Sequence, residues 1–348
     1  MTKDDFETIR KVANDKTLKT PRLPALDPTT DHTSFARSLD GHLTTLHREF
    51  KTLLLPNLHE SKTIAVFSDY GGEHPESQYF TYSFLFHEYD SLQLFNTEIK
   101  EIRNEYGMTR PYKEIAFKSL RYGPLKASLD RILLAANNMI NGLLVTIVVD
   151  KRVRSTFGFN HKAIRKRVHD TLAANSYDLW NDKTLLKLTY ISHTIAYFLK
   201  LLAREGQMLF WMSDEDSILS NLPQKEAAAQ IVQNTISYYC GEGLITTFGY
   251  ATPFSDNTEI DFSSLLSISD LVAGAIADYH QQTNMHKKPM VSTDEVDKIL
   301  SFVSRQGILL KKLCLIFSHE KGESYTSGVL NFHSKTPDPN AVVVPISM

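Results

Sequence analysis

Apolar residues along this 348-residue chain recur with two different periods. Steps of three and four residues place apolar side chains on one face of a helix. Short runs rich in β-branched and aromatic residues, bounded by turn residues, are typical of strands. The helical pattern predicts helices at 33–54, 92–106, 125–140, 185–204, 225–239, 267–280 and 293–305. The strand pattern predicts strands at 64–69, 79–86, 114–120, 143–149, 207–212, 244–250, 310–317 and 325–332.

The order of these elements predicts the fold class. Three extended segments come first, followed by helix, strand, helix, strand and a late helix. Strand–helix–strand steps favour parallel pairing through right-handed crossovers. We therefore expect an α/β protein with a ribonuclease-H-like mixed sheet and flanking helices.

The same pattern divides the chain into three parts. Residues 1–60 contain a proline-rich stretch and an amphipathic helix, and we expect them to form an N-terminal helical extension. Residues 61–285 form the predicted ribonuclease-H-like core. Residues 286–348 are predicted as a C-terminal α+β tail. Either extension could mediate assembly with a second copy of the chain or with another protein.

Several predicted strands end at or just before an aspartate, namely Asp69, Asp150 and Asp214. Sites in open α/β sheets form at the carboxyl ends of parallel strands, where such residues meet. A fourth acid, Asp270, is the lone charge in 266–275, an apolar and small-residue stretch of a predicted helix, where its ordinary explanation is a helix cap. A single strand-end acid is equally consistent with a solvated strand end, so the argument rests on several acids together.

Three carboxylates brought together repel one another unless a cation lies between them. Mg²⁺ or Mn²⁺ fits, because hard cations bind carboxylate oxygens and keep water ligands. Two such ions about 4 Å apart stabilise an in-line displacement at phosphorus. Asp69 and Asp270 are the first two predicted metal ligands. The third is either Asp150, if its strand lies beside the first strand, or Asp214, which opens an acidic cluster.

Two short motifs resemble those of a known family. Residues 68–72 match the Asp and a nearby Gly of an opening Asp-Glu-Ser-Gly motif, with Tyr70 and Gly71 in place of Glu and Ser. Residues 267–274 match a closing motif, Gln-x-x-Asp-Leu-x-Ala-Gly, with Ser267 in place of Gln.

Three further stretches between these motifs are similar to the same family. Residues 114–118 match an internal Glu-x-x-Phe-Lys stretch, and residues 148–151 and 213–215 match two later strand ends. Over residues 62–282 the chain therefore resembles an uncharacterised bacterial ribonuclease-H-like family, the domain of unknown function 3800. Glu114 is a further candidate for the metal shell, although a charge on a surface strand is ordinary.

The segment 151–167 is basic and has no acid. Phe157, Phe159 and His161 are interleaved with its charges. Basic side chains neutralise phosphates, and aromatic rings stack on unpaired bases. A solvated loop and helix face is the ordinary explanation for such a run, but its place directly after Asp150 favours nucleic-acid binding. Its basic residues are Lys151, Arg152, Arg154, Lys162, Arg165, Lys166 and Arg167.

Composition limits the remaining possibilities. The chain is 42% hydrophobic and 22% charged, with a net charge of −2, so nucleic-acid binding requires a local basic patch. Its longest apolar run, 142–149, is too short to span a membrane, and no secretory signal is visible at the N-terminus. Only two cysteines are present, which argues against a disulfide framework. We expect a cytoplasmic protein.

These observations lead to one main hypothesis and two alternatives. The main hypothesis is a Mg²⁺- or Mn²⁺-dependent nuclease or related phosphoryl-transfer enzyme acting on nucleic acid. The first alternative is a catalytically inactive ribonuclease-H-like binding or interaction module, because the opening motif departs at Tyr70 and Gly71. The second is a structural or regulatory partner that assembles through its extensions.

Overall fold

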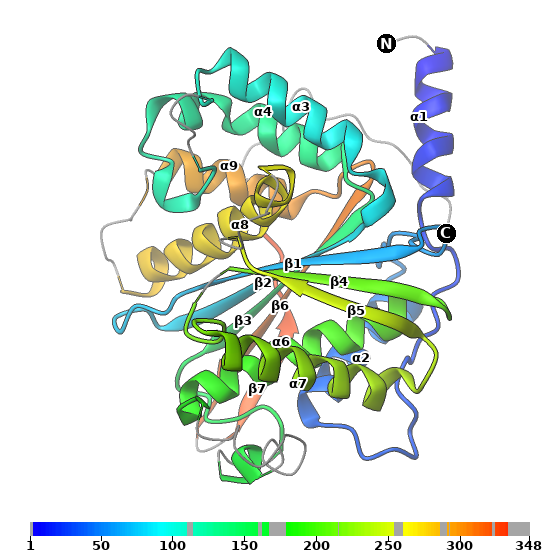
Figure 1. Ribbon diagram of the computed structural model, residues 1–348, viewed down its shortest axis with the longest axis vertical. Coiled ribbons are helices and arrows are strands. Elements are labelled where there is room, and N and C mark those ends of the chain that lie inside the picture. Colours follow the sequence, from blue (N-terminus) through cyan, green and yellow to red (C-terminus); the bar gives the residue numbers. More distant parts are fainter. Residues whose placement is uncertain are drawn as a thin grey trace.

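A central sheet with helices on both faces organises the molecule (Figure 1). The computed structural model describes residues 3–109, 114–158, 162–166, 179–214, 216–253, 260–285, 291, 293–321 and 324–332. The predicted α/β class, with a mixed sheet and flanking helices, is confirmed.

The described strands form one mixed sheet in the order β5-β4-β1-β2-β3-β6-β7. In this sheet β2 is antiparallel to both β1 and β3, while β4 is parallel to β1 and β5 is parallel to β4. On the other side, β6 is parallel to β3 and β7 is antiparallel to β6. The strands are β1 (Thr63–Gly71), β2 (Tyr79–Glu88), β3 (Gly142–Asp150), β4 (Gln207–Ser213), β5 (Ile245–Ala251), β6 (Leu310–His319) and β7 (Tyr325–Val329).

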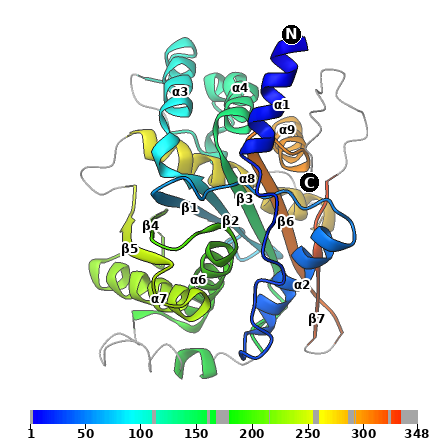
Figure 2. The ribbon, with the colours of Figure 1, turned by 90° about the vertical axis from the view of Figure 1, so that its right-hand side faces the viewer.

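Helices cover the two faces of the sheet, each over its own apolar core (Figures 1 and 2). The face that we call the α8 face carries α3 (Gln93–Glu105), α4 (Gly123–Met139), α8 (Ile260–Met285) and α9 (Thr293–Ser304). The opposite face, the α6 face, carries α2 (Ser34–Arg48), α6 (Asp182–Leu202) and α7 (Leu222–Cys240). Outside these layers lies α1 (Lys3–Asp15), and two short 3₁₀ turns, η1 (Tyr89–Ser91) and η2 (Phe117–Ser119), pack on the α8 face.

Side chains alternate between the two cores along each strand, because successive residues of a strand point to opposite faces. In β1, Ala65 and Phe67 pack in the α8-face core, whereas Ile64 and Val66 pack in the α6-face core. This alternation assigns Asp69 to the α8 face.

The prediction of a strand at 114–120 is wrong. Residues 114–116 are irregular and are followed by η2. Ile115, Phe117 and Leu120 look strand-like in sequence because they are apolar, but they pack in the core under the helices of the α8 face. The third strand is therefore β3, and the first crossover returns to the sheet at β4, next to β1.

Both predicted extensions contribute to the same layers as the core. The segment 286–348 supplies β6 and β7, which extend the sheet beyond β3. At the other end of the chain, α2 buries Phe35, Leu39 and Leu43 in the α6-face core. The chain before it is held by the Leu18 N–H, which donates to the Leu55 carbonyl at 2.8 Å.

Candidate acidic site

Asp69 lies near the carboxyl end of β1 and is 8% exposed. It pairs across the sheet with Ser83 of β2. One of its carboxylate oxygens, Oδ1, accepts a hydrogen bond from the Tyr70 N–H at 2.5 Å. The carboxylate is thus held at a strand end, under the helices of the α8 face.

Helix α8 crosses the ends of β1 and β2 and brings Asp270 to this place. Ser269 Oγ donates to the Phe67 carbonyl at 2.9 Å, and Thr81 Oγ1 donates to the Ala273 carbonyl at 2.9 Å. The two bonds anchor α8 to the strands on both sides of Asp270. The approach at Gly71 is close, since a Cβ there would lie 2.9 Å from the Ala273 carbonyl oxygen.

Phe117 contacts two residues of the closing motif, Asp270 and Gly274. The Phe117 N–H donates to Asp270 Oδ2 at 2.6 Å. The Phe117 ring lies against Gly274, where a Cβ would come within 2.4 Å of ring atoms. Asp270 therefore accepts from η2 rather than from a free amide of its own helix, which argues against the helix-cap explanation.

Asp214 completes the acidic group. It follows β4 directly, and its N–H donates to the Ser68 carbonyl of β1 at 3.3 Å. Because β4 is parallel to β1, the carboxyl ends of both strands lie at the same edge of the sheet.

The three aspartates interact electrostatically. Burial raises the pKa of Asp69 well above its usual value, and the charges of Asp270 and Asp214 raise it further. Burial also raises the pKa of Asp270 to about 7; the Phe117 N–H opposes this rise, whereas Glu114 and Asp214 add to it. Asp69, Asp214 and Asp270 therefore form one group, which we call the acidic group.

Asp150 does not join the acidic group. Ser83 pairs with both Asp69 and Thr146, so Asp150 lies two strands away from Asp69 and four residues further along. Strand geometry then separates the Asp69 and Asp150 Cα atoms by roughly 16 Å. Arg152 binds the Asp150 carboxylate, with Nη2 2.6 Å from Oδ2 and Nε 3.0 Å from Oδ1. Burial alone would raise the pKa of Asp150, but the bonds and charge of Arg152 hold it below its ordinary value.

Glu114 lies beside the acidic group but at the surface. Its carboxylate is exposed and lies 4.0 Å from the Lys118 ammonium. Its charge nevertheless contributes to the raised pKa of Asp270. Glu114 therefore influences the site without being enclosed in it.

The acidic group matches a divalent cation in donor chemistry only. Carboxylate oxygens are the ligands that Mg²⁺ and Mn²⁺ prefer. Over the part of the chain that the structure describes, however, no three His, Cys, Asp or Glu side chains are arranged so that they could hold a metal ion.

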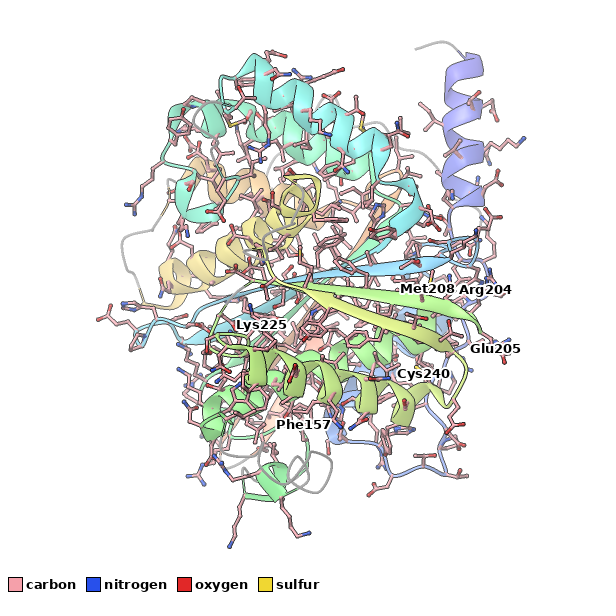
Figure 3. The ribbon with its side chains drawn as sticks, in the orientation of Figure 1. Phe157, Arg204, Glu205, Met208, Lys225 and Cys240 are labelled. Carbon is pink, nitrogen blue, oxygen red and sulfur yellow. The ribbon has the colours of Figure 1, made fainter. Side chains whose placement is uncertain are left out.

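The basic segment is divided between structural contacts and exposed charge. Phe157 is buried against Phe35 and Tyr190 in the α6-face core, so its ring is not available to stack on a base (Figure 3). Arg165 forms an ion pair with Asp182. Arg152, Arg154, Lys162 and Lys166 are exposed, Arg152 being the partner of Asp150, and Lys151 is half-buried. Phe159, His161 and Arg167 lie outside the described residues.

A second polar network lies behind the acidic group, on the α6 face, and was not predicted from the sequence. The Tyr70 hydroxyl lies 2.7 Å from Ser68 Oγ and accepts from Ser213 Oγ at 2.9 Å. The ammonium of Lys187 lies 4.4 Å from the centre of the Tyr70 ring. Lys187 also binds the carboxylates of Glu73 and Asp216. Its signal in the sequence is a lone lysine among the apolar residues of 185–191.

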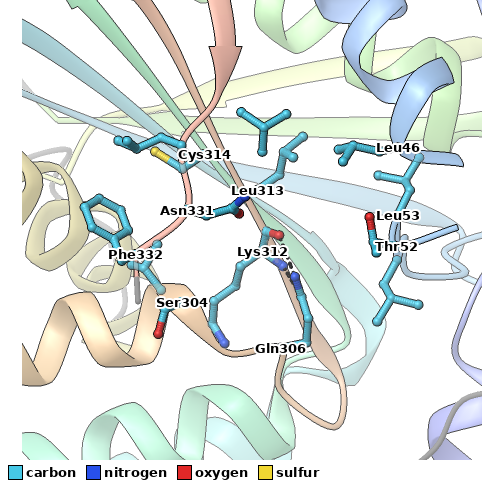
Figure 4. A pocket seen from close by; sticks show the side chains of 14 residues that line it. Leu46, Thr52, Leu53, Ser304, Gln306, Lys312, Leu313, Cys314, Asn331 and Phe332 are labelled. Atoms are coloured by element: carbon cyan, nitrogen blue, oxygen red, sulfur yellow. Dashed lines mark hydrogen bonds between the residues drawn. The ribbon is translucent and has the colours of Figure 1, made fainter. Parts of the chain in front are cut away.

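Two cavities lie in other parts of the described structure. One of about 260 Å³ lies beside β6 and β7, where Gln306 pairs with the backbone of Lys312 through two hydrogen bonds (Figure 4). Another of about 810 Å³ lies near the ends of α6 and α7, lined in part by Arg204, Glu205 and Cys240 (Figure 3). Neither cavity is lined by a predicted acid.

No family model, curated protein or solved structure matches this chain. Within the described ranges, no helix combines the length and the apolar character needed to cross a bilayer. The acidic group is therefore the feature of the molecule that bears most directly on its function.

Proposed function

We propose that this chain is a Mg²⁺- or Mn²⁺-dependent nuclease or related phosphoryl-transfer enzyme with a ribonuclease-H-like core. The observation that carries the proposal is the acidic group itself. Asp69 of β1, Asp214 after β4 and Asp270 of α8 come from distant parts of the chain to the end of two parallel strands. Their mutual repulsion is a cost that a divalent cation offsets.

The sheet order supports the fold part of the proposal. In ribonuclease-H-like topology, the strand that follows the first crossover helix lies beside the first strand. Here β4 pairs with β1 in parallel, which favours Asp214 over Asp150 as the third acid. The resemblance to the domain of unknown function 3800 rests on the same residues, since the closing motif supplies Asp270.

In this proposal the carboxylates of the acidic group hold the cation. A cation held there by Asp69, Asp214 and Asp270 would stabilise charge on a phosphoryl group and would activate water. Asp69 and Asp270 both have raised pKa values, so a cation would compete with protons for these carboxylates. Metal affinity therefore increases with pH.

A catalytically inactive nucleic-acid-binding module is the second candidate. It is favoured by the arrangement of the possible ligands, because no three of them among the described side chains are placed so that they could hold a metal ion. Tyr70, which replaces the Glu of the resembled opening motif, also lies with its hydroxyl in the Ser68–Ser213 network on the other face.

A cleavage assay tests the proposal. Purified protein is incubated with single-stranded DNA, single-stranded RNA, duplex DNA and an RNA–DNA hybrid, with Mg²⁺, Mn²⁺ or EDTA. We expect metal-dependent cleavage, and a loss on the order of 10³-fold in Asp69→Asn and in Asp270→Asn, because each removes a ligand worth several kcal/mol.

Asp130→Asn is the matched control. Asp130 is an exposed aspartate on α4 that pairs with Lys298, and its substitution should leave cleavage unchanged. If the protein binds nucleic acid but does not cleave it with Mg²⁺ or with Mn²⁺, the enzyme hypothesis is overturned and the binding module is supported.

A further inference from the structure

Two lysine side chains share one aromatic ring at the carboxyl end of the sheet. Phe80 lies on β2 and packs against the α6-face core, while remaining partly exposed. The Lys151 ammonium lies 4.7 Å from the centre of its ring, and the Lys183 ammonium lies 5.3 Å from it. Attraction between a cation and the face of an aromatic ring holds each ammonium there.

The two lysines carry like charges at close range. Burial, and then the charge of Lys183, lowers the pKa of Lys151 to about 8. Lys151 is fixed by donating to the His74 carbonyl at 2.7 Å. Among the described residues no carboxylate forms an ion pair with either lysine, and the neighbouring acid, Glu73, is bound to Lys187. A bound anion would relieve this repulsion.

The lysine pair lies at the same end of the sheet as the acidic group. Asp69 pairs with Ser83, three residues from Phe80 on β2. Strand geometry places the Asp69 and Phe80 Cα atoms roughly 11 Å apart. Exposed Arg154 lies three residues after Lys151, whereas the charge of Arg152 is paired with Asp150. Phe80 packs on the α6 face and Asp69 lies on the α8 face, so a polyanion contacts both places where it crosses this edge of the sheet.

We propose that Lys151 and Lys183 form a phosphate subsite over the Phe80 ring, which binds the backbone of the nucleic acid beside the acidic group. The identity of the ligand rests on the proposed function. The subsite includes Lys183, which lies outside the basic segment. In this arrangement Phe80 holds the two ammonium groups, and it is not a platform for a base.

Binding at several salt concentrations tests the subsite. The probe is a fluorescein-labelled single-stranded oligonucleotide, followed by anisotropy in EDTA over a series of KCl concentrations. Each phosphate contact contributes about 0.7 to the slope of log K against log salt for single strands. We expect the Lys151→Gln/Lys183→Gln variant to bind more weakly, with a slope reduced by about 1.4.

Two variants control for net charge and for folding. Lys11→Gln/Lys298→Gln removes the same charge from an exposed position on α1 and from a half-buried position on α9, where Lys298 pairs with Asp130, and should keep the wild-type slope. Lys151→Arg/Lys183→Arg keeps the charge, so the slope of log K against log salt should stay close to the wild-type value. Equal slopes for the Gln variant at the subsite and the control Gln variant would overturn the proposal.

Inorganic phosphate separates two sources of the anion. If titration calorimetry shows phosphate binding that is lost in Lys151→Gln/Lys183→Gln while the oligonucleotide slope is unchanged, the subsite binds a free phosphate and not a nucleic acid. Because these measurements omit divalent cations, they do not depend on cleavage. If the protein cleaves no nucleic acid, a reduced salt dependence in the lysine variant still supports the subsite. If the salt dependence is unchanged, the cleavage assay still tests the nuclease.

Discussion

Asp69 and Tyr70 are neighbours in the chain but serve networks on opposite faces of the sheet. Asp69 belongs to the acidic group, whereas the Tyr70 hydroxyl joins Ser68 of β1 to Ser213 of β4. Trp211 Nε1 donates to the same Ser68 hydroxyl at 2.9 Å. The residue that departs from the resembled motif thus fastens β1 to β4 directly behind the acids. This departure alters the α6 face and leaves Asp69 in place.

The raised pKa of Asp270 predicts a stability that depends on pH. Its folded value of about 7 lies above the ordinary 3.8, so between these values the folded state holds a proton that the unfolded state has lost. The contribution of Asp270 to the free energy of unfolding therefore falls as pH rises through this window. Asp270→Asn, which keeps an oxygen acceptor for the Phe117 N–H, should stabilise the protein by about 2–3 kcal/mol at pH 8.

At pH 4 the same substitution should change the free energy of unfolding little, because wild-type Asp270 is then protonated. Urea denaturation at both pH values measures the difference. Asp130→Asn is exposed and serves as the control, with no change expected at either pH. An equal effect of Asp270→Asn at pH 4 and pH 8 would contradict the raised pKa.

At the scale of elements, the contact between α8 and η2 positions Asp270. Gly274 allows the Phe117 ring to lie where a Cβ would be, and the Phe117 N–H reaches Asp270 from that position. Gly274→Ala should therefore separate α8 from η2 and lower the free energy of unfolding by about 1–3 kcal/mol, as overpacked cores do. Thermal denaturation measures the loss.

The control for this substitution is Gly41→Ala on α2. Gly41 is also helical, but a Cβ there meets no atom within 4 Å. Alanine is the better helix former, so this variant should be stabilised by about 0.5–1 kcal/mol. If both variants shifted stability in the same direction, the close packing of Gly274 on Phe117 would not matter.

The sequence predicted the elements better than their pairing. Hydrophobic periodicity located β1, β2, β3 and β4 and the helix that carries Asp270, because each buries a regular apolar face. It misjudged 114–120, since Ile115 and Phe117 are buried without any ladder of strand hydrogen bonds. That error moved the crossover by one strand and left Asp150 and Asp214 undecided.

The acidic group could be predicted only in part for the same reason. The sequence predicts Asp69 from a strand end and Asp270 from a lone charge in the apolar stretch 266–275. Which third acid joins them depends on the strand that pairs with β1, a long-range contact that no local pattern encodes. The network of Tyr70 and Lys187 likewise depends on three distant segments meeting on one face.

At the scale of the whole molecule, the sheet depends on its last strands. All residues of β3 are buried, and β6 covers its second edge. A chain truncated after residue 309 would expose this aliphatic edge, and we expect it to be insoluble or to lose its cooperative thermal transition. Removal of residues 1–10 is the control, since its described side chains are exposed or half-buried. Soluble, cooperative folding of the chain truncated at 309 would show that β6 and β7 are dispensable.

This dependence also affects how the protein is made. β3 ends at Asp150, but its partner β6 begins only at Leu310. At translation rates of about 5–20 residues per second, the open edge of β3 waits on the order of 10 s or longer for its neighbour. During that interval the nascent chain carries an unpaired apolar strand, the kind of surface that chaperones bind. We therefore expect nascent chains that end before Leu310 to bind chaperones at the ribosome more than the full chain does.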